Sequence, residues 1–258
     1  MSLARVDDLG DRLVVVNLNS TRRGALTPDL YQAILDAVRL AAEPRFRSVI
    51  LTSEGGFFCA GGDLNVLATR RDLSPAERRG KIDQLHGLIR AIRACPVPVI
   101  ASVEGGAAGA GASLALVCDM IVAAAGAKFT ASYVRAGLVP DGGLTSALSR
   151  MLPRQLAMEM CLLARPITAE RLAQLGVINA AVPAGTALEE AQALADELAR
   201  GPREAQGVIR ELVANAYETS EEAQLDAERD AMALAQGGPE AAEGIAAFLE
   251  KRKPTFTR

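Results

Sequence analysis

The feature that most constrains this fold is an alternation, over residues 11–124, of short β-branched runs with longer segments of helical periodicity. Four runs have the composition of buried strands, namely residues 11–17, 48–52, 99–103 and 120–124. Between them, Thr27-Pro28-Asp29 has the pattern of a helix start, and apolar residues recur at helical spacing over residues 75–94. Strands and helices that alternate with short connections predict an α/β fold in which helices cover the sheet.

The composition changes beyond about Pro166, where Ala, Glu, Leu and Arg dominate and almost no strand signal remains. Four further helices are expected over residues 188–200, 202–216, 221–235 and 240–252. Such a tail fits a helical subdomain or an element that joins subunits.

Bulk composition excludes several classes of protein. The 258 residues carry a formal charge of −3, only 3% are aromatic, and Trp is absent, so neither nucleic acid nor an anionic membrane surface is expected as a partner. The most apolar stretch, residues 105–118, is too short to span a bilayer. The four cysteines are widely spaced, with no cluster typical of a metal site, and the N-terminus has no apolar core of a signal peptide. We expect a cytoplasmic protein without a bound metal.

A glycine-rich segment, residues 105–113, follows one predicted strand and opens a helix. Its glycine spacing does not match a dinucleotide-binding loop, it lacks the Lys of a nucleotide-binding P-loop, and it lacks the last glycine of a nucleophile elbow. Two interpretations remain: close packing of strand and helix, or backbone N–H groups that stabilise a developing oxyanion. A second turn with small residues, 57–64, follows another strand and could supply a second donor. Asp63 in that turn has the features of a helix N-cap.

The order of five motifs resembles the crotonase superfamily, also called the enoyl-CoA hydratase/isomerase family, over nearly the whole chain. The motifs are Ala25-Leu26, F-C-A-G-G-D-L at 58–64, P-V-I-A-S-V-E-G-G-A-A-G-A-G-A at 98–112, G-L-V-P-D-G-G at 137–143 and E-G-I-A-A-F-L-E-K-R at 243–252. The resemblance implies the crotonase (ClpP/crotonase-like) fold, an α/β fold of repeated ββα units with a helical C-terminal region. It also implies a core over residues 1–195 that holds the acyl-CoA site, and a region over 196–258 for oligomerisation and CoA contact.

The resemblance assigns the catalytic roles. In the family, two backbone N–H groups bind the thioester oxygen, and the matching residues are Gly62 and Ala110. Hydratases use two glutamates, whose positions hold Ser113 and Tyr133, and the phenol of Tyr133 is a poor base at neutral pH. Asp141 matches the acidic residue of the isomerases. The resemblance therefore implies an acyl-CoA isomerase or lyase, and above all an enoyl-CoA isomerase in which Asp141 moves a proton.

Other reactions of the family stay open: ring-opening isomerisation of an aromatic-derived CoA ester, hydration, decarboxylation and thioester hydrolysis. Dehalogenation is a further alternative, because His86, Tyr133 and Asp141 match the histidine, tryptophan and aspartate of dehalogenases, although the tryptophan is replaced. A member that binds acyl-CoA without catalysis is the alternative from another class. His86, the only histidine, lies on an apolar helix face, so a structural role is its default interpretation.

Recognition of CoA is also implied by the resemblance. The matching residues are Arg22, Ala25, Leu26, Ala60, Gly62, Asp63, Leu64, Ala110 and Tyr133 in the core, with Phe248 and Lys251 near the C-terminus. The last two contact the nucleotide end in the family, often from a neighbouring subunit. No cofactor is expected beyond the CoA of the substrate, and a homotrimer or a hexamer is expected as the assembly.

Overall fold

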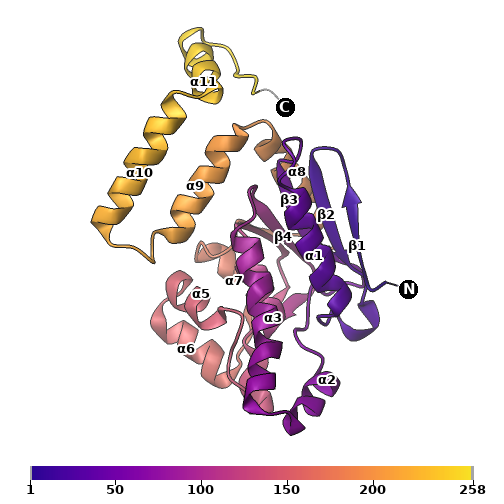
Figure 1. Cartoon of the computed structure of the whole chain (residues 1–258). Helices are drawn as coiled ribbons and strands as arrows, with labels where there is room; N and C mark the ends of the chain where they lie inside the picture. The colour runs from indigo at the N-terminus through magenta and orange to yellow at the C-terminus, as the bar shows by residue number, and fades with distance from the viewer. Residues whose placement is uncertain (1, 257–258) are drawn as a thin grey trace.

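A six-stranded sheet forms the centre of the computed structural model, which describes residues 2–256 (Figure 1). Its strands, in spatial order, are β1 (Ala4–Asp8), β2 (Arg12–Asn17), β3 (Ser48–Ser53), β4 (Val99–Val103), β6 (Met120–Ala124) and β9 (Ala180–Val182). β1 pairs antiparallel with β2, and every other pair in this sheet is parallel. The predicted strands at residues 11–17, 48–52, 99–103 and 120–124 are confirmed.

A second sheet of three short strands lies beside the two turns of small residues, 57–64 and 105–113. It contains β5 (Gly106–Ala108), β7 (Lys128–Thr130) and β8 (Ile167–Thr168), with β7 in the middle. Cys59 forms an isolated parallel bridge with Ala107, which attaches the 57–64 turn to β5. This sheet therefore holds the two turns side by side.

Helices cover both faces of the main sheet, as an α/β fold requires. The helices of residues 2–256 are α1 (Pro28–Leu40), α2 (Leu64–Thr69), α3 (Pro75–Arg93), α4 (Ala110–Leu116), α5 (Leu144–Met151), α6 (Arg154–Leu163), α7 (Ala169–Gln174), α8 (Ala187–Ala199), α9 (Arg203–Asn215), α10 (Glu221–Gln236) and α11 (Pro239–Leu249), of which α1, α3 and α4 pack on one face of the main sheet and α8 on the other. Thr27 caps α1 as expected, because its hydroxyl accepts the N–H of Leu30 at 3.2 Å. Three short 3-10 helices also occur, at Ser20–Arg22, Arg70–Asp72 and Ser132–Ala136.

Alternate residues of the strands point to opposite faces of the main sheet and pack into two hydrophobic layers. Leu13 and Val15 of β2 point into the larger layer, which also contains residues of α1, α3 and α4. Val14 and Val16 point into the opposite layer, where three alanines of α8 pack closely on the sheet. The burial of both faces explains why the β-branched runs were uninterrupted.

Two expectations for the C-terminal part need correction. The prediction of almost no strand beyond Pro166 is wrong, because β8 and β9 occur there and β9 completes one edge of the main sheet. With two and three residues, both strands are too short to leave a compositional signal. The last predicted helix, 240–252, ends at Leu249, and Lys251 adopts a positive φ of 54°.

The helices α9 to α11 are called the C-terminal arm below. Hydrogen bonds from Arg203 and Arg210 to main-chain oxygens of the core hold α9 in place, and α10 and α11 extend beyond it (Figure 1). Neither α9 nor α10 has a buried residue in this single chain. Large apolar side chains on the arm are exposed, among them Ile209, Val213, Leu225, Met232, Leu234 and Phe248. The predicted boundary at residue 195 falls within α8, which packs on the main sheet, and this division into two regions stays a prediction.

Candidate active site

Two turns with small residues are joined by backbone hydrogen bonds. The N–H of Ala108 donates to the carbonyl of Cys59 at 2.9 Å, which fixes the first turn against the glycine-rich segment. The N–H of Leu26 donates to the carbonyl of Gly61 at 2.8 Å, and that of Ala60 donates to the carbonyl of Arg23 at 3.0 Å. The 57–64 turn thus lies between the 22–26 loop and the start of α4.

Space, as well as hydrogen bonding, fixes this contact. Gly61 has a φ of +88°, and a Cβ atom there would lie 2.7 Å from the carbonyl oxygen of Ala108 and 3.0 Å from the nitrogen of Ala110. A Cβ atom on Gly111 would overlap the carbonyl oxygen of Cys59. Only glycine permits the two backbones to approach this closely.

The N–H groups of Gly62 and Ala110 are left without a hydrogen-bond acceptor from residues 2–256. Ala110 is the first residue of α4, so its N–H has no partner within the helix. Gly61 precedes Gly62, and a Cβ atom built on Gly61 would lie 3.0 Å from the nitrogen of Ala110, so the two donors lie close together. Their arrangement suits an oxygen atom that acquires negative charge.

Asp141 lies at the centre of a polar cluster. The hydroxyl of Tyr133, in the 3-10 helix Ser132–Ala136, donates to Oδ1 of Asp141 at 2.7 Å. The hydroxyl of Ser113, on α4, donates to the main-chain oxygen of Asp141 at 3.0 Å. Nε2 of His86, on α3, accepts the N–H of Gly142 at 3.3 Å. Side chains from three separate elements therefore hold residues 141 and 142.

Electrostatics keeps the phenols of this cluster neutral. Burial, and then the negative charge of Asp141, raises the pKa of Tyr133 far above its ordinary value. The same two causes raise the pKa of Tyr31, which faces the cluster from α1, to about 12. At neutral pH both phenols carry their protons, so Tyr133 is a hydrogen-bond donor to the carboxylate and not a base.

The two parts of the site share α4 as a support. Ala110 and Ser113 lie three residues apart on this helix, hence on neighbouring positions of one face. A Cβ atom on Gly142 would lie 2.9 Å from that of Ser113, so the 141–142 segment packs directly on α4. Around Ala110, the buried residues Leu85 and Ile89 form a small apolar cluster. The unpaired N–H groups and the carboxylate are therefore fixed relative to each other by a rigid, buried helix.

Two buried amides, which the sequence analysis did not identify, hold the 22–26 loop. Nδ2 of Asn17 donates to the carbonyl of Gly24 at 2.7 Å, and Nδ2 of Asn19 donates to the carbonyl of Ala25 at 2.9 Å. Both side chains are buried. Their only signal in the sequence was a polar turn after the first predicted strand, which does not reveal the carbonyls that they bind.

Charged residues predicted to contact CoA are engaged with one another. Arg22 forms an ion pair with Asp63, and the Arg23 guanidinium lies 4.0 Å from the centre of the Phe57 ring. Asp63 is the N-cap of α2, as expected, since its carboxylate accepts the N–H of Asn65 at 2.9 Å. That hydrogen bond is the main cause that lowers the pKa of Asp63. Leu64 follows as an exposed residue at the start of α2.

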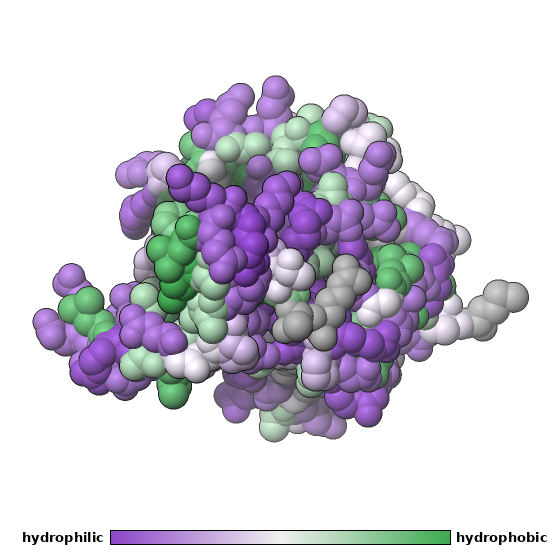
Figure 2. Space-filling view, turned by 90° about the horizontal axis from the view of Figure 1, so that it is seen from above, coloured by the Kyte–Doolittle hydropathy of each residue, from purple (hydrophilic) through white to green (hydrophobic). Residues whose placement is uncertain are grey.

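The structure does not bring Phe248 and Lys251 to the other site residues within one chain. Both are exposed, at the end of the C-terminal arm, whereas α2 lies at the opposite end of the molecule (Figure 1). Seen from above, apolar side chains form separate patches between hydrophilic ones (Figure 2). A role for Phe248 and Lys251 therefore requires a neighbouring subunit.

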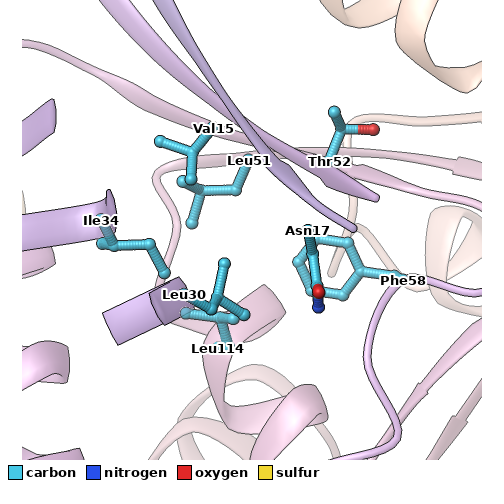
Figure 3. Close-up of a pocket in the computed structure, with 8 residues that line it drawn as sticks. All are labelled: Val15, Asn17, Leu30, Ile34, Leu51, Thr52, Phe58 and Leu114. Atoms are coloured by element: carbon cyan, nitrogen blue, oxygen red, sulfur yellow. The ribbon is translucent and has the colours of Figure 1, made fainter. Parts of the chain in front are cut away.

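A small internal cavity lies in the core, away from Asp141 (Figure 3). It is lined mainly by aliphatic side chains of β2, β3, α1 and α4, with Asn17 and Thr52 at one end.

Within residues 2–256, no cluster of three or more His, Cys, Asp or Glu could hold a metal ion, and no helix has the length and apolar character to cross a membrane.

Comparison with known proteins shows which family the chain resembles. The sequence model of the enoyl-CoA hydratase/isomerase family matches residues 10–258. A probable enoyl-CoA hydratase of Rhodobacter capsulatus is 38% identical over 96% of this chain and 92% of its own. The 1,2-epoxyphenylacetyl-CoA isomerase of Escherichia coli is 35% identical over 95% of each chain. The crystal structure of an enoyl-CoA hydratase from a Polaromonas species is 42% identical, has a TM-score of 0.95, and covers 98% of this chain and 99% of its own.

Proposed function

Because the chain belongs to the enoyl-CoA hydratase/isomerase family, we propose that it is an enoyl-CoA isomerase that shifts a double bond through a thioester enolate. The family and the crotonase fold predicted from the motifs are confirmed. Acyl-CoA is the substrate class of this family, whereas the particular reaction is our proposal.

The proposed reaction uses one carboxylate twice. Asp141 removes a proton from Cα of a 3-enoyl-CoA, and the electron pair of that C–H bond enters a dienolate whose charge lies on the thioester oxygen. The N–H groups of Gly62 and Ala110 stabilise this oxygen. Asp141 then returns the proton to Cγ, and the double bond moves into conjugation. Preorganised donors of this type are each worth about 3 kcal/mol of transition-state stabilisation.

The observation that carries the proposal is the composition of the polar cluster around α4. The positions where hydratases place their two glutamates hold Ser113 and Tyr133, and both hydroxyls donate hydrogen bonds to Asp141. A hydratase of this family needs one carboxylate to activate water and another to protonate carbon. One carboxylate that both removes and returns a proton is sufficient for isomerisation.

Kinetics of Asp141→Asn test the proposal. The wild-type protein is expected to convert 3-enoyl-CoA esters into conjugated 2-enoyl-CoA esters, with little formation of 3-hydroxyacyl-CoA from the product. The asparagine side chain retains the shape but cannot accept a proton, so kcat is expected to fall by about 10²- to 10⁴-fold. Wild-type turnover by Asp141→Asn, or hydration as the main activity of the wild-type protein, would refute the proposal.

The isomerase of Escherichia coli among the relatives favours one second candidate, isomerisation of an aromatic-derived CoA ester. The same oxyanion donors and the same carboxylate would serve there. A panel of straight-chain enoyl-CoA esters and epoxidised aromatic CoA esters separates the two, because the preferred substrate is the one with the higher kcat/KM.

We further propose that the active assembly is a homotrimer or a hexamer built from trimers. The C-terminal arm supports this, because α9 and α10 bury no residue in the single chain while Met232, Leu234 and Phe248 are among its exposed apolar side chains. A neighbouring subunit would also bring Phe248 and Lys251 to the CoA. Sedimentation equilibrium is expected to give the mass of three or six chains, and a smaller species for Leu234→Asp. A wild-type monomer with full activity would contradict this assembly.

No bound cofactor is part of the proposal, and a cytoplasmic location stays a prediction.

A further inference from the structure

We propose that Tyr133 is a positioning residue: its hydroxyl holds Oδ1 of Asp141, so that Oδ2 alone accepts the substrate proton and returns it. This inference rests on the proposed isomerisation through Asp141. It concerns which oxygen acts, and which residue determines that choice.

The contacts around Asp141 divide into two kinds. Ser113 and His86 act on the main chain, through the carbonyl of Asp141 at 3.0 Å and the N–H of Gly142 at 3.3 Å. Within residues 2–256, only the Tyr133 hydroxyl reaches the carboxylate itself, at 2.7 Å, and it also lies 3.5 Å from the main-chain oxygen of Asp141. No hydrogen bond from the described part of the chain reaches Oδ2. The main-chain contacts fix where the residue lies, and Tyr133 fixes how the carboxylate is turned.

The surroundings of Tyr133 keep its hydroxyl the donor, and the Asp141 carboxylate the acceptor, in their hydrogen bond. Its ring is partly buried, packed against the main hydrophobic core, and its oxygen lies 3.5 Å from the Ser113 hydroxyl. Burial and the charge of Asp141 keep the phenol protonated. Tyr133 therefore remains a donor to Oδ1 throughout turnover, and the two oxygens of Asp141 are not equivalent.

A fixed carboxylate has a chemical consequence. The proton taken from Cα forms an O–H bond at Oδ2, and the electron pair left on carbon enters the dienolate. When the dienolate electrons form the new C–H bond at Cγ, the O–H bond at Oδ2 breaks and the carboxylate is restored. If the carboxyl group cannot rotate, the same proton is carried from Cα to Cγ more often than it is lost to water. The fraction of protons carried from Cα to Cγ therefore distinguishes orientation of the Asp141 carboxylate from a general contribution to the stability of the fold.

Tyr133→Phe and Ser113→Ala form a matched pair, because each removes one hydroxyl from the same cluster. With substrate deuterated at Cα, Tyr133→Phe is expected to lower kcat by about 10- to 100-fold, to change KM by less than about 2-fold, and to transfer a smaller fraction of deuterium to Cγ. Ser113→Ala is expected to keep the wild-type transfer fraction. Both proteins are assayed below their unfolding temperatures, measured by circular dichroism.

A conservative replacement completes the test. 3-Fluorotyrosine at position 133 keeps the ring and the hydroxyl, and it is expected to restore the transfer fraction. A wild-type kcat and transfer fraction in Tyr133→Phe would overturn the inference, as would equal losses of transfer in Tyr133→Phe and Ser113→Ala. If Tyr133→Phe does not fold, an absence of rescue by 3-fluorotyrosine overturns it. Asp141→Asn distinguishes failure of the proposed function from failure of this inference. Wild-type turnover by Asp141→Asn refutes the isomerase proposal. If Asp141→Asn is inactive and Tyr133→Phe has no effect, only the role of Tyr133 is refuted.

Discussion

The candidate site has two halves, one formed by backbone groups and the other by side chains. The oxyanion half consists of backbone, with donors at Gly62 and Ala110, and the turns that carry them are closely packed. The proton-transfer half consists of side chains, with Asp141 held by residues from α3, α4 and the 3-10 helix Ser132–Ala136. Close packing of backbone defines the oxyanion half, whereas the functional groups of side chains define the proton-transfer half.

This difference explains why one fold can support several reactions. The donor at Ala110 is a main-chain N–H, so this position tolerates a change of its side chain but not a change that pushes the turns apart. A side-chain cluster can exchange its groups while the fold stays the same, as Ser113 and Tyr133 do in place of glutamates. On the proposed mechanism, the backbone donors are common to several reactions, whereas the proton-transfer half decides which reaction occurs.

The largest expected effect comes from breaking the packing of the oxyanion half. In Gly111→Ala, the new Cβ would overlap the carbonyl oxygen of Cys59, so the two turns must separate. We expect a loss of about 2–4 kcal/mol in the free energy of unfolding, measured by urea denaturation, together with the loss of most activity. Gly80→Ala on α3 is the control, since a Cβ there meets nothing within 4 Å. That control should not be destabilised, and equal effects of the two substitutions would contradict the steric argument.

A smaller effect is expected when one donor is removed and the fold is kept. Proline is tolerated at the first position of a helix, and Ala110→Pro deletes the N–H at the start of α4. We expect kcat/KM to fall by about 10²- to 10³-fold while the far-ultraviolet circular dichroism stays unchanged. Ala110→Gly keeps the N–H and should remain within about 3-fold of the wild-type kcat/KM. Full activity of Ala110→Pro would exclude this N–H as an oxyanion donor.

The sequence predicted the oxyanion half better than the proton-transfer half. Strands rich in β-branched residues and the glycine pattern leave strong local signals, so four strands of the main sheet and both turns were located in advance. The short strands β5, β7, β8 and β9, with three residues or fewer, leave no such signal. Their positions are determined by pairing with segments distant in the sequence.

The contacts of the proton-transfer half depend on tertiary structure. The sequence identified Asp141 as a candidate, but Tyr133 was expected to contact substrate, and its hydrogen bond to Asp141 joins residues eight positions apart, across the end of a 3-10 helix and the turn that follows it. His86 was interpreted first as a structural residue, and its ring accepts the N–H of Gly142, a partner that the sequence did not indicate. Neither contact follows from spacing, because each requires the packing of helices that the sequence pattern does not orient.

The separation of the two halves is tested most directly by measuring binding and proton exchange together in Asp141→Asn. If backbone binds the thioester and Asp141 moves the proton, affinity for a saturated acyl-CoA should stay within about 3-fold of wild type by calorimetry. Exchange of the substrate Cα proton with deuterated water, measured by NMR, should fall by at least about 10²-fold. Exchange at the wild-type rate, or loss of binding in proportion to the loss of exchange, would contradict the account.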